Sequence, residues 1–352
     1  MRPLPPLAAT GIGSVPFTDP EAAAALILKV LPEIPFWPQM VRLGYQEDMV
    51  SQAGKGLPAI KVEDAARAAV VDPAIPRDQA LAQFYEAFLG QELAPFALGR
   101  EEARGFYALL EGVARGGGPP PALKGQVAGP VTVAGMIKDL EGKPILFDRE
   151  LTQAVCLGLA RKAAWQAEEF RQAGAQPVIF FDEPYLTGFG SAFLPISREE
   201  VAEILGSTLE AAREAGEVLL GVHCCGNTDW DLLLKAPLDI VSFDSHGYFE
   251  SLALYEKSLK NFYNRGGRLA WGLVPTAGEA LEAETLEDLW QRFQGQVKDL
   301  GGRGFDLKMV LSQALLTPAC GLGYLSPELA ARALSLLGEL TNRGRAWLAE
   351  MG

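Results

Sequence analysis

The apolar run PVIFFD, from Pro177 to Asp182, indicates how this chain folds. It is short, apolar almost throughout and closed by an acidic residue. A strand with apolar residues on both faces is typical of a parallel sheet covered by helices on both sides. Similar runs recur along the chain at Ala9–Ser14, Ala122–Ala128, Val218–Cys224, Asp239–Asp244, Arg268–Leu273 and Leu307–Gln313, with a shorter one near Pro35–Gln39.

Helix signals stand between these runs. Asp19 before a proline predicts a helix N-cap, and the Ser197–Glu200 capping box predicts another. About eight strand–helix units in 352 residues predict one α/β domain, a (β/α)8 TIM barrel. Residues 41–118 are expected to form a helical insertion near the N-terminus. An open doubly wound sheet is the alternative, but Gly11–Gly13 does not continue into a dinucleotide-binding fingerprint.

Composition and charge exclude several classes of function. Hydrophobic residues make up 49% and charged residues 21%, the balance of a globular protein. The net charge of -13 argues against nucleic acid and acidic membranes as partners, because both bind clustered basic residues. The start of the chain lacks the apolar core of a signal peptide, and no apolar stretch could span a membrane. We therefore expect a cytoplasmic protein.

Sulfur and imidazole groups gather at the ends of the predicted strands, which in a barrel form the active-site face. His223 and Cys225 stand two apart, so alternation along a strand places both on one side and Cys224 on the other. Cys320 follows the last predicted strand, which neighbours the first one in a closed barrel. These residues could instead fill the core, but an imidazole together with thiolates is a set of ligands typical of zinc. We therefore expect zinc, with Asp244 able to complete a tetrahedron.

Such a centre has a definite chemistry. Three protein ligands and one open position are typical of catalytic zinc. A substrate thiol bound to the ion loses its proton, and the thiolate is the species that attacks. The sequence therefore predicts that zinc activates a small thiol for alkylation, while Cys156 and Cys224 serve packing.

Six short motifs follow one another along nearly the whole chain: Ile12–Ser14 with Pro16, Asp48–Val50, Gly129–Thr132, Asp182–Pro184, His223–Cys225 and Pro318–Leu322. Together they resemble the C-terminal barrel of the cobalamin-independent methionine synthase family, which lies in one superfamily with uroporphyrinogen decarboxylase. The resemblance implies zinc-dependent methyl transfer to homocysteine, giving methionine. It implies as zinc ligands His223, Cys225, Cys320 and, at the family's glutamate position, Asp244.

The resemblance also implies an acceptor site. The residues that would bind a homocysteine-like acceptor are Ile12, Gly13, Ser14, Asp182 and Glu183. Ser14 and the neighbouring backbone would bind the carboxylate, and Asp182 the ammonium group. Asp182 and His246 are the candidate catalytic residues. His246 could orient a metal ligand, shuttle a proton or replace Asp244 as fourth ligand.

Two departures from the family concern the methyl donor. Met136 stands where the family has a tryptophan that stacks against folate. Gly272–Ala277 lacks the family's D-x-H, proposed to give a proton to the departing folate. Folate leaves poorly without that proton, whereas a methyl-corrinoid leaves without one. We therefore predict a methyl-corrinoid, a corrinoid protein or another non-folate donor.

Other functions stay open. Arg42–Gln46 replaces the family's glutamates before D-M-V, so coenzyme M or another small thiol could be the acceptor. A uroporphyrinogen decarboxylase-like enzyme would need basic residues rather than a metal set. A non-enzymatic corrinoid- or metal-binding module would not need Ser14 and Asp182 to bind an amino acid.

Overall fold

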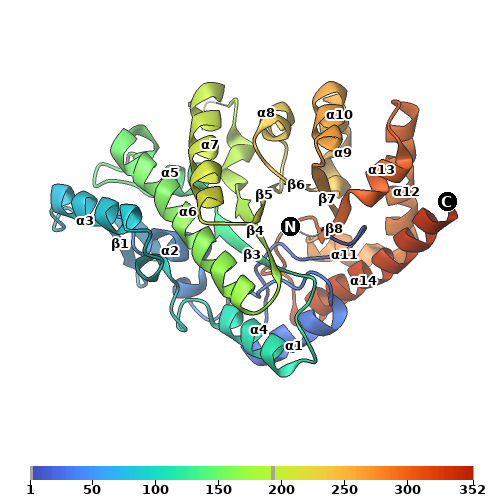
Figure 1. Cartoon of the computed structure of the whole chain (residues 1–352), viewed down its shortest axis with the longest axis horizontal. Coiled ribbons are helices and arrows are strands. Elements are labelled where there is room, and N and C mark those ends of the chain that lie inside the picture. Colours follow the sequence, from blue (N-terminus) through green and yellow to red (C-terminus); the bar gives the residue numbers. More distant parts are fainter. Residues whose placement is uncertain (1–2, 192–194, 352) are drawn as a thin grey trace.

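The computed structural model describes residues 3–191 and 195–351. Within these residues one curled sheet contains six parallel strands in chain order: β3 (Ala122–Ala128), β4 (Gln176–Asp182), β5 (Leu219–Cys224), β6 (Ile240–Phe243), β7 (Arg268–Val274) and β8 (Ala314–Pro318). Helices surround the outer side of this sheet (Figure 1). Five of the predicted runs are thus confirmed as strands or strand cores.

Residues 7–15 and 33–41 lie where the first two strands were expected. They form isolated parallel bridges instead, Ala9 with Leu316, Ser14 with Gln39 and Phe36 with Lys124. Backbone hydrogen bonds follow the same path from β8 to residues 7–10 and from residues 33–37 to β3. Proline lacks the N–H that a ladder needs, which explains why Pro35 and Pro38 interrupt the second segment. The six-stranded half-barrel is compatible with a TIM-like fold, but the described residues do not form eight regular strands.

The predicted strand Leu307–Gln313 is wrong. This run forms a helix, α13 (Leu307–Ser312), and β8 begins only afterwards. Asp306 caps the helix by accepting hydrogen bonds from the backbone N–H groups of Lys308 and Met309. A short apolar run fits a buried strand and a short helix equally well. The aspartate in front of the run is the signal that separates them.

Most of the outer helices begin after a residue whose side chain caps the first turn. The outer helices are α1 (Pro20–Val30), α5 (Pro130–Met136), α6 (Arg149–Gln172), α7 (Arg198–Glu214), α8 (Trp230–Lys235), α9 (Ser245–Ala253), α10 (Glu256–Asn264), α11 (Gly278–Ala283), α12 (Leu286–Gly302) and α14 (Pro327–Glu350). Asp19 caps α1, and Ser197 with Glu200 forms the capping box of α7. Both predicted caps are confirmed. No helix among the described residues is both long and apolar enough to cross a membrane.

Residues 41–118 are not helical throughout. They contain α2 (Met49–Gly54), α3 (Arg77–Leu89) and α4 (Arg104–Arg115), together with an antiparallel hairpin of β1 (Ile60–Glu63) and β2 (Ala68–Val71). The hairpin was not predicted. Val71 N–H donates to the carbonyl of Lys138 at 3.0 Å, which ties the hairpin to the segment after α5.

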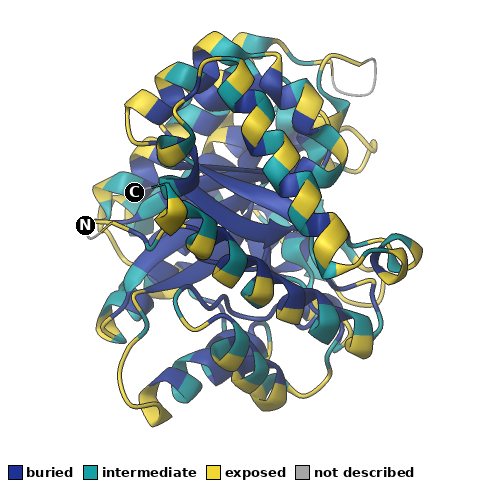
Figure 2. Cartoon of the chain, turned by 90° about the vertical axis from the view of Figure 1, so that its right-hand side faces the viewer, coloured by how far each residue is buried: buried dark blue, intermediate teal, exposed yellow. Residues whose placement is uncertain are grey.

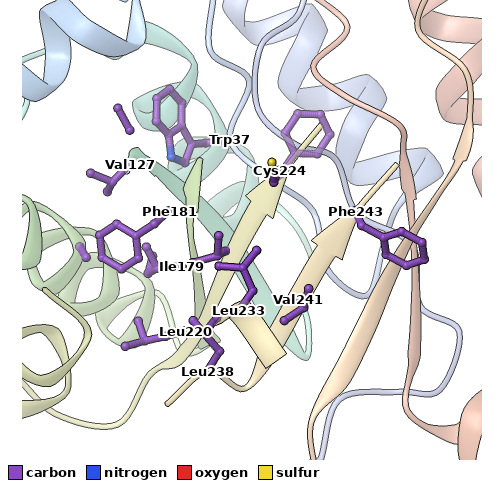
Figure 3. Close-up of a cluster of buried hydrophobic side chains, with 14 of the residues drawn as sticks. Trp37, Val127, Ile179, Phe181, Leu220, Cys224, Leu233, Leu238, Val241 and Phe243 are labelled. Atoms are coloured by element: carbon purple, nitrogen blue, oxygen red, sulfur yellow. The ribbon is translucent and has the colours of Figure 1, made fainter. Parts of the chain in front are cut away.

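Two apolar clusters lie on the two faces of the sheet. The larger one fills the space between strands and helices, and Cys224 packs within it (Figure 3). Exposed residues lie mainly on the outer faces of the helices (Figure 2). The smaller cluster lies inside the curl and includes Val178, Phe180 and Ile240. Side chains two residues apart on a strand point to the same face. Asp182 on β4 and Ser242 on β6 therefore also point into the curl, close to the ends of their strands.

Candidate metal centre

His223, Cys225 and Cys320 meet at the carboxyl ends of β5 and β8. One potential ligand atom from each residue lies within 4.8 Å of the others. Zinc bond lengths of about 2.0–2.3 Å place the ligands of a tetrahedral ion about 3–4 Å apart. His223 is buried and both cysteines are half-buried. The structure thus brings together the three residues predicted as metal ligands.

The His223 ring is oriented by a neighbouring strand. Its Nδ1 lies 3.0 Å from Oγ of Ser242, the residue opposite it in the β5–β6 register. Its Nε2 is buried and has no hydrogen-bond partner among the described atoms. A hydrogen bond at one ring nitrogen commonly fixes the other as a metal ligand. A metal ion would satisfy this unpartnered nitrogen, so the residues fit zinc.

The two cysteines share a proton unevenly. Contact with the Cys320 thiol, and next with His223, lowers the pKa of Cys225 to about 4. The nearby Cys225 sulfur raises the pKa of Cys320. Two sulfurs that compete for one proton would both become thiolates beside a divalent cation. The electrostatics therefore suit a soft metal ion.

Asp244 is positioned differently from these three residues. It caps α9, and its Oδ1 accepts a hydrogen bond from Gly247 N–H at 2.9 Å. Burial raises its pKa. Among the described residues, the close group consists of His223, Cys225 and Cys320 without Asp244. Asp244 as a fourth ligand remains a prediction.

His246 is directed toward a carboxylate that the sequence did not reveal. Its Nε2 lies 2.9 Å from Oε1 of Glu284, in the loop between α11 and α12. Glu284 also binds Arg292 at 2.7 Å, and its carbonyl accepts from Arg332. Burial alone would raise the pKa of Glu284, but Arg292 and then His246 lower it. This contact occupies one nitrogen of His246, whose role in proton transfer remains a prediction.

The predicted acceptor segment Ile12–Ser14 lies against the metal centre. The carbonyl of Ser14 accepts a hydrogen bond from Leu322 N–H at 2.8 Å. A Cβ atom at Gly321 would lie 2.1 Å from Oγ of Ser14, so any larger residue there would displace the Ser14 side chain. Gly321 directly follows Cys320. The hydroxyl predicted to bind the acceptor therefore touches the turn that carries a predicted metal ligand.

Asp182 ends β4 beside His223 in the strand register. Its Oδ1 is buried without a partner among the described atoms. Burial raises its pKa to about 6, while Lys124 and His223 oppose this effect. A buried carboxylate with a free oxygen suits a cationic ligand, because a lone buried charge is costly. The predicted role of Asp182 in binding an ammonium group remains a prediction.

Glu183 points away from this site. Its carboxylate accepts hydrogen bonds from the N–H groups of Val131 and Thr132 at 2.9 and 2.8 Å, and from the Thr132 hydroxyl at 2.6 Å. Burial raises its pKa to about 7. The side chain anchors the first turn of α5, which places the next loop. Its predicted contact with substrate gains no support from this geometry.

Other sequence features lie at the periphery. Met136 ends α5 with 48% of its surface exposed. Cys156 is buried, and its thiol donates to the carbonyl of Ile204 at 3.6 Å. It borders a hollow of about 340 Å³ between α6 and α7, which none of the predicted site residues lines. These surroundings are consistent with the packing role predicted for Cys156.

The sequence did not reveal Ser242 and Lys124, although both carry a signal. Each is a polar residue inside an apolar strand run. Both side chains point into the curl of the sheet, toward the predicted site. Glu284 follows no recognisable motif, and only the three-dimensional fold pairs it with His246.

Solved structures with a similar fold exist. A B12-independent methionine synthase from Shewanella sp. W3-18-1, in complex with selenomethionine, has a TM-score of 0.58 and 17% identity, over 98% of this chain and 99% of that one. A methyltransferase from Methanosarcina mazei has a TM-score of 0.54 and 18% identity, over 96% and 94%. The chain shares their fold. No family model and no curated protein matches the sequence.

Proposed function

We propose that this protein is a zinc-dependent methyltransferase. It would methylate a small, homocysteine-like thiol from a methyl-corrinoid or another non-folate donor, giving methionine or a related thioether. The observation that carries this proposal is the convergence of His223 with two cysteine sulfurs, near Asp182, whose Oδ1 has no partner among the described atoms. The two similar folds, a methionine synthase and a methyltransferase, support the same class of reaction.

The residues divide the work as follows. His223, Cys225 and Cys320 would hold zinc, which makes a bound thiol acidic enough to react as its thiolate. Ser242 keeps the His223 ring oriented. Asp182 would bind the ammonium group of the acceptor, and Ser14 with its backbone the carboxylate. The acceptor is thereby held with its sulfur beside the metal ligands.

The reaction itself is a nucleophilic displacement. The sulfur lone pair forms the new S–C bond while the bond between the methyl carbon and the donor breaks. The electron pair of that bond stays with the donor. A corrinoid accepts this pair without a proton, which is why Met136 and Gly272–Ala277 favour a non-folate donor.

The test begins with protein purified without chelators. We expect about one zinc ion per chain, because the site offers one set of convergent ligands. Purified protein is then given L-homocysteine with methylcobalamin and, separately, with methyltetrahydrofolate. Methionine should form with methylcobalamin. Absence of zinc would contradict the metal centre, and turnover with folate alone would contradict only the donor.

A further inference from the structure

Lys124 is a charged residue that the proposed function does not use. It lies in the middle of β3, and its side chain is fully buried. Removing an ammonium group from water is costly unless other groups replace the lost solvation. The groups that contact the Lys124 ammonium therefore indicate its role.

The ammonium group binds the acceptor segment directly. Lys124 Nζ donates to the carbonyl of Ile12 and, at 3.2 Å, to Oε1 of Gln126. It also lies 4.8 Å from the centre of the Phe180 ring, a cation–π contact. The Gln126 side chain packs so closely on Gly13 that a Cβ atom there would lie 2.8 Å from it. Lys124 and Gln126 thus hold the backbone that leads into Ser14.

Asp182 is the carboxylate that influences Lys124. Burial lowers the pKa of Lys124 to about 8, and the Asp182 charge opposes this effect. Lys124 opposes the rise in the pKa of Asp182 in turn. Among the described residues, Lys124 forms no ion pair within 4.0 Å. Oδ1 of Asp182 has no hydrogen-bond partner among the described atoms, so it stays available to a ligand.

We infer that Lys124 is the positioning residue of the acceptor site. This inference rests on the proposed function. Through the Ile12 carbonyl, Lys124 places the Gly13–Ser14 backbone for a carboxylate. A thiol without a carboxylate gains nothing from this placement.

The test compares two thiols on zinc-loaded protein. Isothermal titration calorimetry measures the binding of L-homocysteine and of 2-mercaptoethanol, which lacks the amino-acid group. Lys124→Met should weaken homocysteine binding by at least about tenfold. Zinc content, 2-mercaptoethanol binding and kcat at saturating acceptor should stay unchanged, so the loss appears in KM.

Lys162→Met is the matched control. Lys162 is almost as deeply buried, but it lies on α6, and its charged neighbours are Lys55 and Glu102. It borders the same narrow cavity as Gln126 and Asp182, yet its ammonium group donates to the carbonyl of Phe96 rather than to the acceptor segment. It should leave the affinity for both thiols unchanged. Lys124→Leu, which cannot donate a hydrogen bond, carries the same test should Lys124→Met not fold.

The outcomes separate this inference from the proposed function. Equal losses for both thiols in Lys124→Met, no loss for homocysteine, or the same loss in Lys162→Met would each overturn the role of Lys124. Wild-type protein that bound no zinc, or bound neither thiol, would overturn the proposed function and this inference with it.

Discussion

The six-stranded sheet and the two bridged segments beside it hold their functional residues in different ways. In the part from β3 to β8, a continuous backbone ladder positions Asp182, His223 and Ser242. In the part made of residues 7–15 and 33–41, only isolated bridges are present. There the acceptor segment depends on side chains such as Lys124. The comparison teaches that the metal ligands and the acceptor segment should be separable by substitution.

The largest effect is expected for Cys320→Ser. A serine hydroxyl is a poor replacement for a thiolate ligand, so zinc should be lost and activity should fall by at least about 100-fold. Metal analysis by mass spectrometry and a methyl-transfer assay measure both. Cys224→Ser is the control, because Cys224 packs among apolar residues away from the centre. If the Cys320→Ser protein retained its zinc, Cys320 would not be a zinc ligand.

A smaller effect is expected for Ser242→Ala, which tests the contact between β6 and His223. Without the Ser242 hydroxyl, Nδ1 of His223 loses its partner at 3.0 Å. Groups that orient a metal-bound histidine typically contribute about 10–100-fold to metal affinity. Competition with a zinc-binding dye should reveal this loss. An unchanged zinc affinity would mean that the β6 strand does not orient the ligand.

Gly321→Ala tests the boundary between the two parts. The added Cβ would lie 2.1 Å from Oγ of Ser14, so the Ser14 side chain must move. We expect the KM for the acceptor to rise about tenfold, the effect of losing roughly 1.4 kcal/mol of binding. Gly206→Ala is the control, because its Cβ would meet open space on α7. Steady-state kinetics that gave equal KM values would contradict the contact between Ser14 and the acceptor.

Lys162→Met should affect stability alone. Burial lowers the pKa of Lys162 from 10.5 to about 7, with the Lys55 charge adding to the effect. Its charge therefore destabilises the fold fully below pH 7, and this penalty disappears as pH rises through 10.5. The variant should gain up to roughly 4 kcal/mol at pH 7 and about a third of that at pH 9.5. Urea unfolding at both pH values measures this, and a gain independent of pH would refute it.

The sequence predicted features that depend on neighbouring residues. The caps at Asp19 and Ser197 and the run Ala122–Ala128 need only local information, and the structure confirms them. His223 and Cys225 could be paired because strand alternation is also local. Cys320 could be added because adjacent first and last strands follow from a barrel.

The remaining features depend on contacts between distant segments. Ser242 faces His223 only through the register of two strands, and His246 meets Glu284 only through the loop after α11. The second predicted strand was interrupted because Pro35 and Pro38 cannot donate to a ladder. The Leu307–Gln313 run became a helix because Asp306 caps it. In each case tertiary contacts or one polar residue outweighed the apolar pattern.

The hydrogen bond between Val71 and Lys138 has a practical consequence for anyone who wishes to shorten this protein. Deleting the hairpin at residues 60–71 would leave the Lys138 carbonyl without its partner, although that residue lies far along the chain. Lys138 follows α5, whose first turn Glu183 anchors beside the site. A minimal version should therefore keep the hairpin, or supply a new donor to Lys138, if the loop after β3 is to retain its shape.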